Sequence, residues 1–229
     1  MHASKLVLVA LAGLVVACSN VTPDPIGGDM MGPETEIPAP APPPPTPMAD
    51  PCYQIDFLFV VDDSYSMYEE QSNLTQNFPK FLNIIDNYVN SAGAFLDYRL
   101  AVTTTGVANQ ANPSTYAVDG AFRGECGIDR PWVERNDYEV GDAFTCRATV
   151  GVDGPGLEMP LLAVERALTD RIADGTNGEF LREDALLAII ILTDEDDCAN
   201  YDGTIADPEC HADLKDHVGF LDALTGDRS

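Results

Sequence analysis

The chain has 229 residues, enough for one domain of ordinary size with appendages. Its 38 acidic residues outnumber 12 basic ones and give a formal net charge of −26 at pH 7. Such a charge repels phosphate backbones and anionic lipid headgroups, so we expect neither nucleic-acid binding nor docking on a membrane through a basic face. Hydrophobic residues make up 45% of the chain, which is sufficient for a buried core.

Residues 1–17 have the pattern of a signal peptide. One lysine precedes the apolar run from Leu6 to Ala17, which is too short to span a bilayer. The run ends in Val-Val-Ala-Cys18, which resembles the lipobox of bacterial lipoproteins. The resemblance implies cleavage before Cys18 and acylation of this residue, hence a membrane anchor. Ser19 is similar to the signal for the outer membrane of Gram-negative cells. The alternative is a plain secretory signal that happens to end in cysteine.

Residues 18–51 are predicted to be a lipidated, disordered tether. Eleven of the 17 prolines fall within residues 19–51. Proline donates no backbone hydrogen bond, and this stretch has too little apolar surface to fold, so we expect an extended spacer between the membrane and a folded domain over residues 52–229.

The folded part begins with signals of an α/β protein. The apolar run 55–61 predicts a central parallel strand covered on both faces, and it stops abruptly at Asp62. Apolar residues spaced by three and four from Leu74 to Val89 predict a helix that Pro79 should kink. Residues 98–104 predict a second strand.

The second half repeats this alternation after a long irregular segment. We interpret residues 106–154 as an elaborated loop carrying one short strand. A helix is expected over 158–172, a central strand over 185–193 and a helix over 212–224. Strands that alternate with helices predict a doubly wound, mainly parallel Rossmann-like sheet.

Both apolar strands end in acidic residues. Asp62 and Asp194 would meet at the carboxyl edge of the sheet if their strands are neighbours, and Ser64 and Ser66 add hydroxyls on the turn after Asp62. Carboxylates and hydroxyls form an oxygen-rich site that prefers Mg²⁺ or Mn²⁺, with Ca²⁺ as a further option. Because neighbouring carboxylates repel each other, the arrangement itself favours a cation.

The segment Asp62-Asp63-Ser64-Tyr65-Ser66 matches the D-x-S-x-S signature of the von Willebrand factor A domain, and Leu192-Thr193-Asp194 matches that family's second metal-site strand. The resemblance covers residues 52–229. It implies a metal-ion-dependent adhesion site, in which Ser64 and Ser66 are direct ligands and Asp62 and Asp194 bind directly or through water. It also implies a partner protein that offers an acidic residue to the metal.

Further segments are similar to exported A-domain lipoproteins of myxobacteria: Phe57–Asp62, Asn77–Pro79, Gly156–Glu158, Phe180–Arg182 and Thr193–Cys198. One position departs from the family, because Glu158 stands where a threonine is expected. Glu158 is either a fifth metal ligand or a carboxylate at the start of a helix, stabilised by the helix dipole. The acidic run after Asp194 is either a solvated loop or a second Ca²⁺ site.

With Cys18 lipidated, five cysteines remain in an exported chain that can keep disulfides. We pair Cys126 with Cys146 and Cys198 with Cys210, because each pair closes a local loop. Cys52 precedes the first strand and lies roughly 20 Å from Cys198, too far for a disulfide. Its partner, and the one or two strands that the family would add, are therefore expected beyond residue 229.

The sequence predicts a membrane-anchored lipoprotein of the cell envelope that binds proteins through a metal, and not an enzyme. The chain shows no G-x-S-x-G, H-E-x-x-H or P-loop motif. Two alternatives stay open: a metal-free structural scaffold of the cell envelope, and a metal-dependent hydrolase that uses the paired carboxylates.

Overall fold

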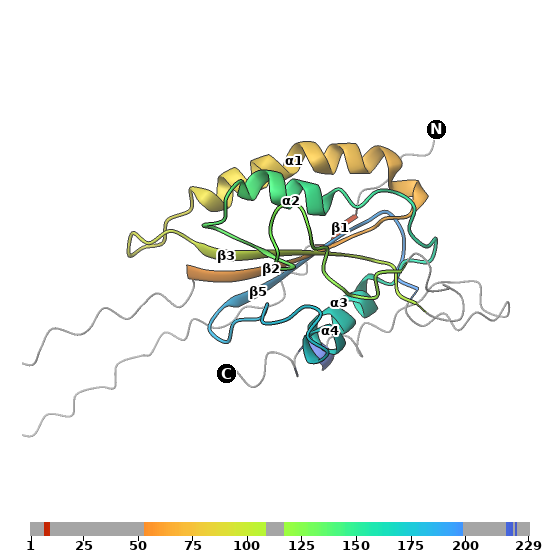
Figure 1. The fold of residues 1–229 in the computed structure, drawn as a ribbon. Helices are drawn as coiled ribbons and strands as arrows, with labels where there is room; N and C mark the ends of the chain where they lie inside the picture. Colours follow the sequence, from red (N-terminus) through yellow and green to blue (C-terminus); the bar gives the residue numbers. More distant parts are fainter. Residues whose placement is uncertain (1–6, 10–52, 109–116, 199–218, 222, 224–229) are drawn as a thin grey trace, which may run out of the picture.

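The computed structural model describes residues 7–9, 53–108, 117–198, 219–221 and 223. These residues form a mixed α/β fold, in which helices flank an open, mostly parallel sheet (Figure 1). The strand order is β1-β5-β2-β3-β4. The central strands β5, β2 and β3 are parallel, whereas β1 and β4 pair antiparallel at the two edges. The strands are β1 (Val7–Val9), β2 (Gln54–Val61), β3 (Asp97–Thr104), β4 (Val133–Glu134) and β5 (Leu186–Thr193).

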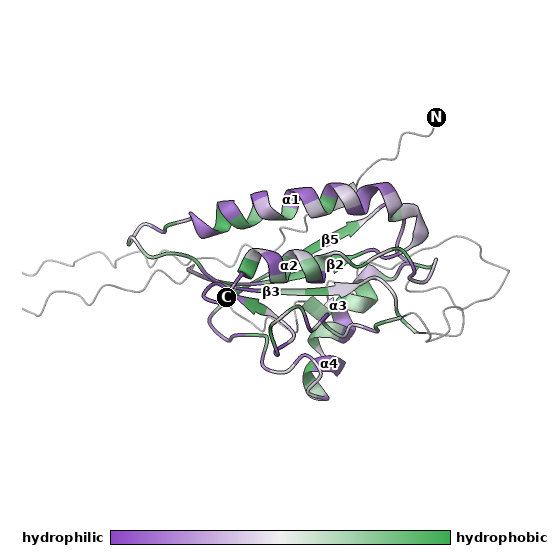
Figure 2. Cartoon of the chain, turned by 45° about the horizontal axis from the view of Figure 1, so that its top comes forward, coloured by the Kyte–Doolittle hydropathy of each residue, from purple (hydrophilic) through white to green (hydrophobic). Residues whose placement is uncertain are grey.

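The three central strands confirm the strands predicted from apolar runs. Their side chains alternate between two cores, as the pleat of a strand requires. Phe57, Phe59 and Val61 face one core, and Leu58 and Val60 face the other. In Figure 2, β5 is hydrophobic along its arrow, whereas α1 mixes hydrophobic and hydrophilic residues. A sheet buried on both faces is therefore the reason for these nearly continuous apolar runs.

Two pairs of helices cover the two faces of the sheet (Figure 1). On one face lie α1 (Tyr68–Asp86) and α2 (Val140–Ala148), and on the other lie α3 (Pro160–Leu168) and α4 (Asp170–Ala173). The helix α1 begins six residues earlier than predicted and continues through Pro79. The helix predicted over 158–172 begins at Pro160 and is divided at Thr169, whose φ of −118° and ψ of −77° depart from regular helical values. Of the helix predicted over 212–224, the described residues 219–221 and 223 are helical.

The segment interpreted as a loop with one short strand does contain that strand, β4, but the interpretation was wrong in missing α2. A disulfide joins Cys146 of α2 to Cys126, as predicted, with 6.0 Å between their Cα atoms. Next to it, the fully buried Arg147 donates through Nη2 to the carbonyls of Glu125, Ile128 and Arg130. These long-range bonds hold α2 against the preceding loop. Cys198 is also disulfide-bonded, but Cys52 and Cys210 lie outside the described residues.

Strand β1 comes from the apolar run that the sequence assigns to a signal peptide. Its three residues pair antiparallel with the end of β5, with Val7 opposite Thr193 and Val9 opposite Ile191. The first five residues of β5 have no strand partner on that side within the described part of the chain. The predicted tether of residues 18–51 lies outside the described residues.

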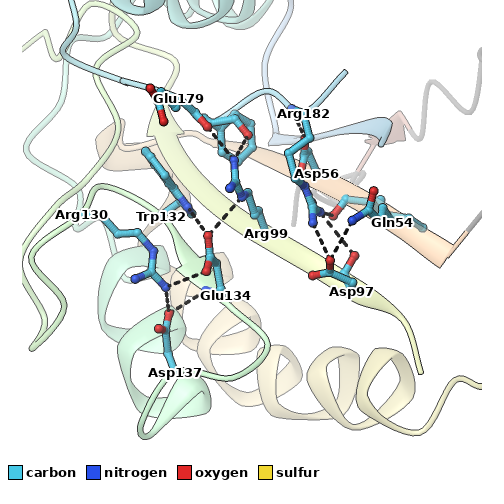
Figure 3. Close-up of polar contacts among 12 residues, drawn as sticks. Gln54, Asp56, Asp97, Arg99, Arg130, Trp132, Glu134, Asp137, Glu179 and Arg182 are labelled. Carbon is cyan, nitrogen blue, oxygen red and sulfur yellow. Dashed lines mark hydrogen bonds and ion pairs between the residues drawn. The ribbon is translucent and has the colours of Figure 1, made fainter. Parts of the chain in front are cut away.

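Charged side chains close the amino ends of the strands (Figure 3). Asp56 in β2 is 1% exposed, and Arg182 donates to its carboxylate from both the backbone N and Nε, each at 2.8 Å. Nη1 of Arg182 also lies 2.9 Å from Oδ2 of Asp97 at the start of β3. Burial raises the pKa of Asp56, and Arg182 opposes that shift. This network holds the loop that precedes β5 against the amino ends of the strands. Asp62 lies at the opposite end of the sheet.

Candidate metal site at the carboxyl ends of β2 and β5

The chain reverses its order across the sheet between β2 and β5. From β2 it crosses to β3 on one side, and later it returns to β5 on the other side. In open α/β sheets such a switch point leaves a crevice at the carboxyl ends of the strands, where ligands bind. Val61 lies opposite Leu192 in the register, so Asp62 and Thr193 follow at the same level. The backbone N–H of Asp62 donates to the carbonyl of Leu192 at 2.9 Å.

Asp62 is fully buried, and its neighbours fix its orientation. Oδ1 accepts a hydrogen bond from the backbone N–H of Ser64 at 2.8 Å, and Oδ2 accepts one from the Thr193 hydroxyl at 2.6 Å. Its backbone carbonyl accepts a third from Nε2 of Gln71 at 2.9 Å. The carboxylate is therefore pre-oriented by the turn that follows β2 and by the end of β5, while α1 holds the backbone of Asp62.

The two predicted serines connect Asp62 to Asp194, with the backbone N–H of Ser64 on Asp62 and the hydroxyl of Ser66 on Asp194. Oγ of Ser64 lies 2.8 Å from Oγ of Ser66. The Ser66 hydroxyl lies 3.2 Å from Oδ1 of Asp194 and 3.5 Å from Oε1 of Glu195. The turn is closed by the backbone N–H of Met67, which donates to the carbonyl of Ser64 and starts the 3-10 helix η2 (Tyr65–Met67). The structure thus brings Asp62, Ser64, Ser66 and Asp194 together in one continuous chain of contacts.

Glu158 adds a buried acid beside this chain. Its side chain is fully buried, and neither carboxylate oxygen has a hydrogen-bond donor. Burial, contact with the Glu195 carboxyl and the charge of Asp62 together raise the pKa of Glu158 to about 9, so without a cation this side chain is a neutral acid at pH 7. Burying an ionised carboxylate without a donor is costly, so Glu158 is either a neutral acid beside Glu195 or the ligand of a cation.

The alternative prediction, that Glu158 is a carboxylate stabilised by the dipole of α3, stays open, but the hydrogen bond at the helix start is made by another acid. The helix begins at Pro160, and the backbone N–H of Leu161 donates to Oδ2 of Asp197 at 2.7 Å. Asp197 therefore serves the helix start, which also gives the acidic run after Asp194 a structural role. Asp196 in that run is exposed to solvent.

Asp63 is a buried neighbour that the sequence did not single out. Burial raises its pKa to about 6; Asp62 adds to the shift, whereas the Thr104 hydroxyl and Arg123 oppose it. The loop before Glu158 closes over it, because the backbone N–H of Gly154 donates to the carbonyl of Asp63 at 2.7 Å. A Cβ on Gly154 would lie 2.2 Å from Oδ1 of Asp63, so only glycine fits here. The loop before Glu158 is therefore built around Asp63.

Sequence reasoning missed four residues that position or surround the site: Asp63, Gln71, Thr193 and Glu195. Thr193 belongs to the Leu192-Thr193-Asp194 motif found in the sequence. Its hydroxyl donates a hydrogen bond to Asp62, which explains the threonine at this position. Among the described residues, no three His, Cys, Asp or Glu side chains already form a metal cage. The candidate site instead combines two serine hydroxyls with carboxylates. Comparison with protein families, with curated proteins and with solved structures finds no match for this chain.

Proposed function

We propose that this chain is a protein-binding domain of the von Willebrand factor A type, which binds its partner through a divalent cation held at the ends of β2 and β5. One observation carries the proposal. The chain of contacts from Asp62 through Ser64 and Ser66 to Asp194 lies at the switch point of the sheet, beside the buried and unpartnered carboxylate of Glu158.

The residues fit a hard cation. Mg²⁺ and Mn²⁺ take oxygen ligands and retain several waters, so two hydroxyls and a few carboxylates suffice. Ser64, Ser66 and Glu158 would bind the ion directly. Both oxygens of Asp62 already accept hydrogen bonds, which suits coordination through water. Asp194 would complete the protein ligands and leave a position for an acidic side chain of a partner protein.

The same hydrogen bonds favour a second candidate, a metal-free scaffold of the cell envelope. Asp62 is satisfied by Ser64 and Thr193 without any ion. Glu158 separates the two functions, because in a scaffold it stays a neutral buried acid, whereas a bound cation would ionise it.

The experiment is thermal unfolding of the full chain with and without Mg²⁺ or Mn²⁺. A hundredfold excess of metal over its dissociation constant should stabilise the folded state by about 2.7 kcal/mol. Asp62→Ala should abolish this gain. Ser66→Ala should reduce it without disturbing the core, because Ser66 is exposed. Asp196→Ala, an exposed acid two residues past Asp194, is the matched control and should keep the gain. A wild type that gains nothing from either metal would make the domain a scaffold.

The anchoring proposal is independent of the metal. We propose that Cys18 carries the lipid that holds the protein on the outer membrane. No helix within the described residues is long and apolar enough to cross a bilayer. Cys18→Ser should therefore release the protein from the membrane fraction. A variant that stays wholly in that fraction, with no acyl mass on the wild type, would contradict the lipid anchor.

A further inference from the structure

Two exposed tyrosines flank the Ser66 hydroxyl. Tyr65, the first residue of η2, is 80% exposed, and Tyr68, the first residue of α1, is 69% exposed. Between them Met67 is fully buried and anchors that turn in the domain. The tyrosine side chains contribute little to the core, so packing does not explain their position beside the candidate metal site. Exposed tyrosines are frequent anchors in protein interfaces.

The surface around these tyrosines is acidic. Glu69 and Glu70 occupy the first turn of α1, directly after Tyr68. Ser66 contacts Asp194 and Glu195 on the other side, and the exposed Asp153 precedes the Gly154 loop. We call the two tyrosines with these five acids the rim of the site: Tyr65, Tyr68, Glu69, Glu70, Asp153, Asp194 and Glu195.

Most arginines in the described part of the chain form ion pairs with acids outside the rim. At the amino ends of the strands, Arg99 pairs with Glu134, Arg130 with Asp137, and Arg182 with Asp56 and Asp97 (Figure 3). On the α3 and α4 side, Arg166 and Arg171 both pair with Asp119. Arg123 reaches toward the site, where it lowers the pKa of Asp63. Within the described residues, no ion pair balances the acids of the rim, which therefore form a negative surface.

A negative rim conflicts with a partner that offers only a carboxylate. Two like charges 4 Å apart near a protein surface repel by up to about 4 kcal/mol. The partner can offset this repulsion with cations around its acid. Arginine suits the rim best, because its guanidinium also stacks on tyrosine rings, with a gain of about 0.5–2 kcal/mol. The domain uses the same contact internally, where the guanidinium of Arg135 lies 4.8 Å from the ring centroid of Phe95.

We propose that the rim recognises an arginine-rich protein segment with a single acidic residue, the acid directed at the metal and the arginines against Tyr65, Tyr68 and the surrounding carboxylates. This inference rests on the proposed function for the acid, but the contribution of the rim can be measured separately.

The test measures binding of three synthetic peptides to the full chain by calorimetry, in Mg²⁺ and in EDTA. The first peptide has a central aspartate flanked by arginines, the second has serines in place of the arginines, and the third has asparagine in place of the aspartate. The protein variants are Tyr65→Ala combined with Tyr68→Ala, and Tyr138→Ala as the control. Tyr138 is 84% exposed and follows a segment bonded to the amino end of β3, far from the site.

In Mg²⁺, the arginine peptide should bind at least about tenfold more tightly than the serine peptide, an advantage that falls with added salt. The double tyrosine variant should lose about tenfold in affinity for the arginine peptide, in the range of two lost cation–π contacts. Tyr138→Ala should bind it as the wild type does, and all variants should melt alike.

The outcomes separate the two proposals. Equal affinities for the arginine and serine peptides in Mg²⁺, or wild-type affinity in the double tyrosine variant, would overturn the rim proposal and leave the metal site standing. An arginine preference that depends on the tyrosines but is the same in EDTA, and the same for the asparagine peptide, would support the rim and contradict the metal. Absence of binding by all three peptides would overturn both.

Discussion

Replacing Glu158 by glutamine preserves the shape of the side chain and removes its ionisable group. The wild-type carboxyl is fully buried without a donor, and burial beside Glu195 and Asp62 raises its pKa to about 9. Each pH unit below a pKa corresponds to about 1.4 kcal/mol, so ionising this group at neutral pH costs a few kcal/mol. A cation that binds the ionised carboxylate must displace the proton, so its affinity should rise by up to about tenfold per pH unit from neutral pH towards the pKa.

The metal-free protein should show the opposite trend in stability. The unfolded chain releases the Glu158 proton near 4.5, whereas the folded chain holds it to about 9. Between these values the folded state binds more protons, so the free energy of unfolding falls as pH rises, by up to about 1.4 kcal/mol per pH unit. Asp63 adds to this fall between its ordinary pKa of 3.8 and its folded pKa of about 6. Acidification should therefore stabilise the metal-free domain until other carboxylates titrate.

The assay combines urea unfolding in EDTA with Mg²⁺ calorimetry, each from about pH 6 to about pH 9, the window that the pKa defines. Glu158→Gln should flatten both pH dependences, stabilise the metal-free protein at alkaline pH and weaken Mg²⁺ binding. Glu183→Gln, an exposed carboxylate in the loop before β5, is the control and should behave as the wild type. A glutamine variant that retains the wild-type pH slope and Mg²⁺ affinity would refute the reasoning.

Two further substitutions test how the chain supports this site. Gly154→Ala places a Cβ 2.2 Å from Oδ1 of Asp63 and should cost about 1–3 kcal/mol in thermal unfolding, with loss of Mg²⁺ binding; Gly156→Ala meets nothing within 4 Å and should be tolerated. Equal melting of the two alanine variants would contradict the packing of this loop. Arg182→Ala leaves the buried Asp56 without its cation and should cost about 3–5 kcal/mol, measured by urea unfolding. A loss within about 0.5 kcal/mol, as for an ordinary surface change, would show that Asp56 finds another partner or is protonated.

The central strands and the meeting of Asp62 with Asp194 could be predicted because they depend on local patterns. An apolar run of this length predicts a buried strand. An acid directly after the run marks the carboxyl end of the strand, where ligands bind in open α/β sheets. That the central strands are parallel follows from their alternation with helices, whereas the sequence left open whether β2 and β5 are neighbours. These signals need no knowledge of distant residues.

The helix α2 and the polar core depend on distant contacts, and the sequence does not reveal them. Arg147 breaks the apolar pattern of α2, yet it is buried because carbonyls of a loop about twenty residues earlier accept its hydrogen bonds. Likewise, the sequence around Asp63 and Gln71 does not indicate that these side chains are buried. The loop at Gly154, about ninety residues later, closes over Asp63, and Gln71 bonds to Asp62. Such residues are identified only when the partner is known.

Strand β2 also decides how the domain would respond to force. The chain enters β2 directly after the predicted tether, and the strand ends at Asp62, so an anchor and a bound partner would pull on opposite ends of one strand. β2 is paired with parallel strands on both sides, with β3 along its whole length and with β5 from Ile55 onward. A load along this strand shears the two ladders together, so their hydrogen bonds would have to break collectively and not one after another. The geometry suits an attachment that must hold under tension.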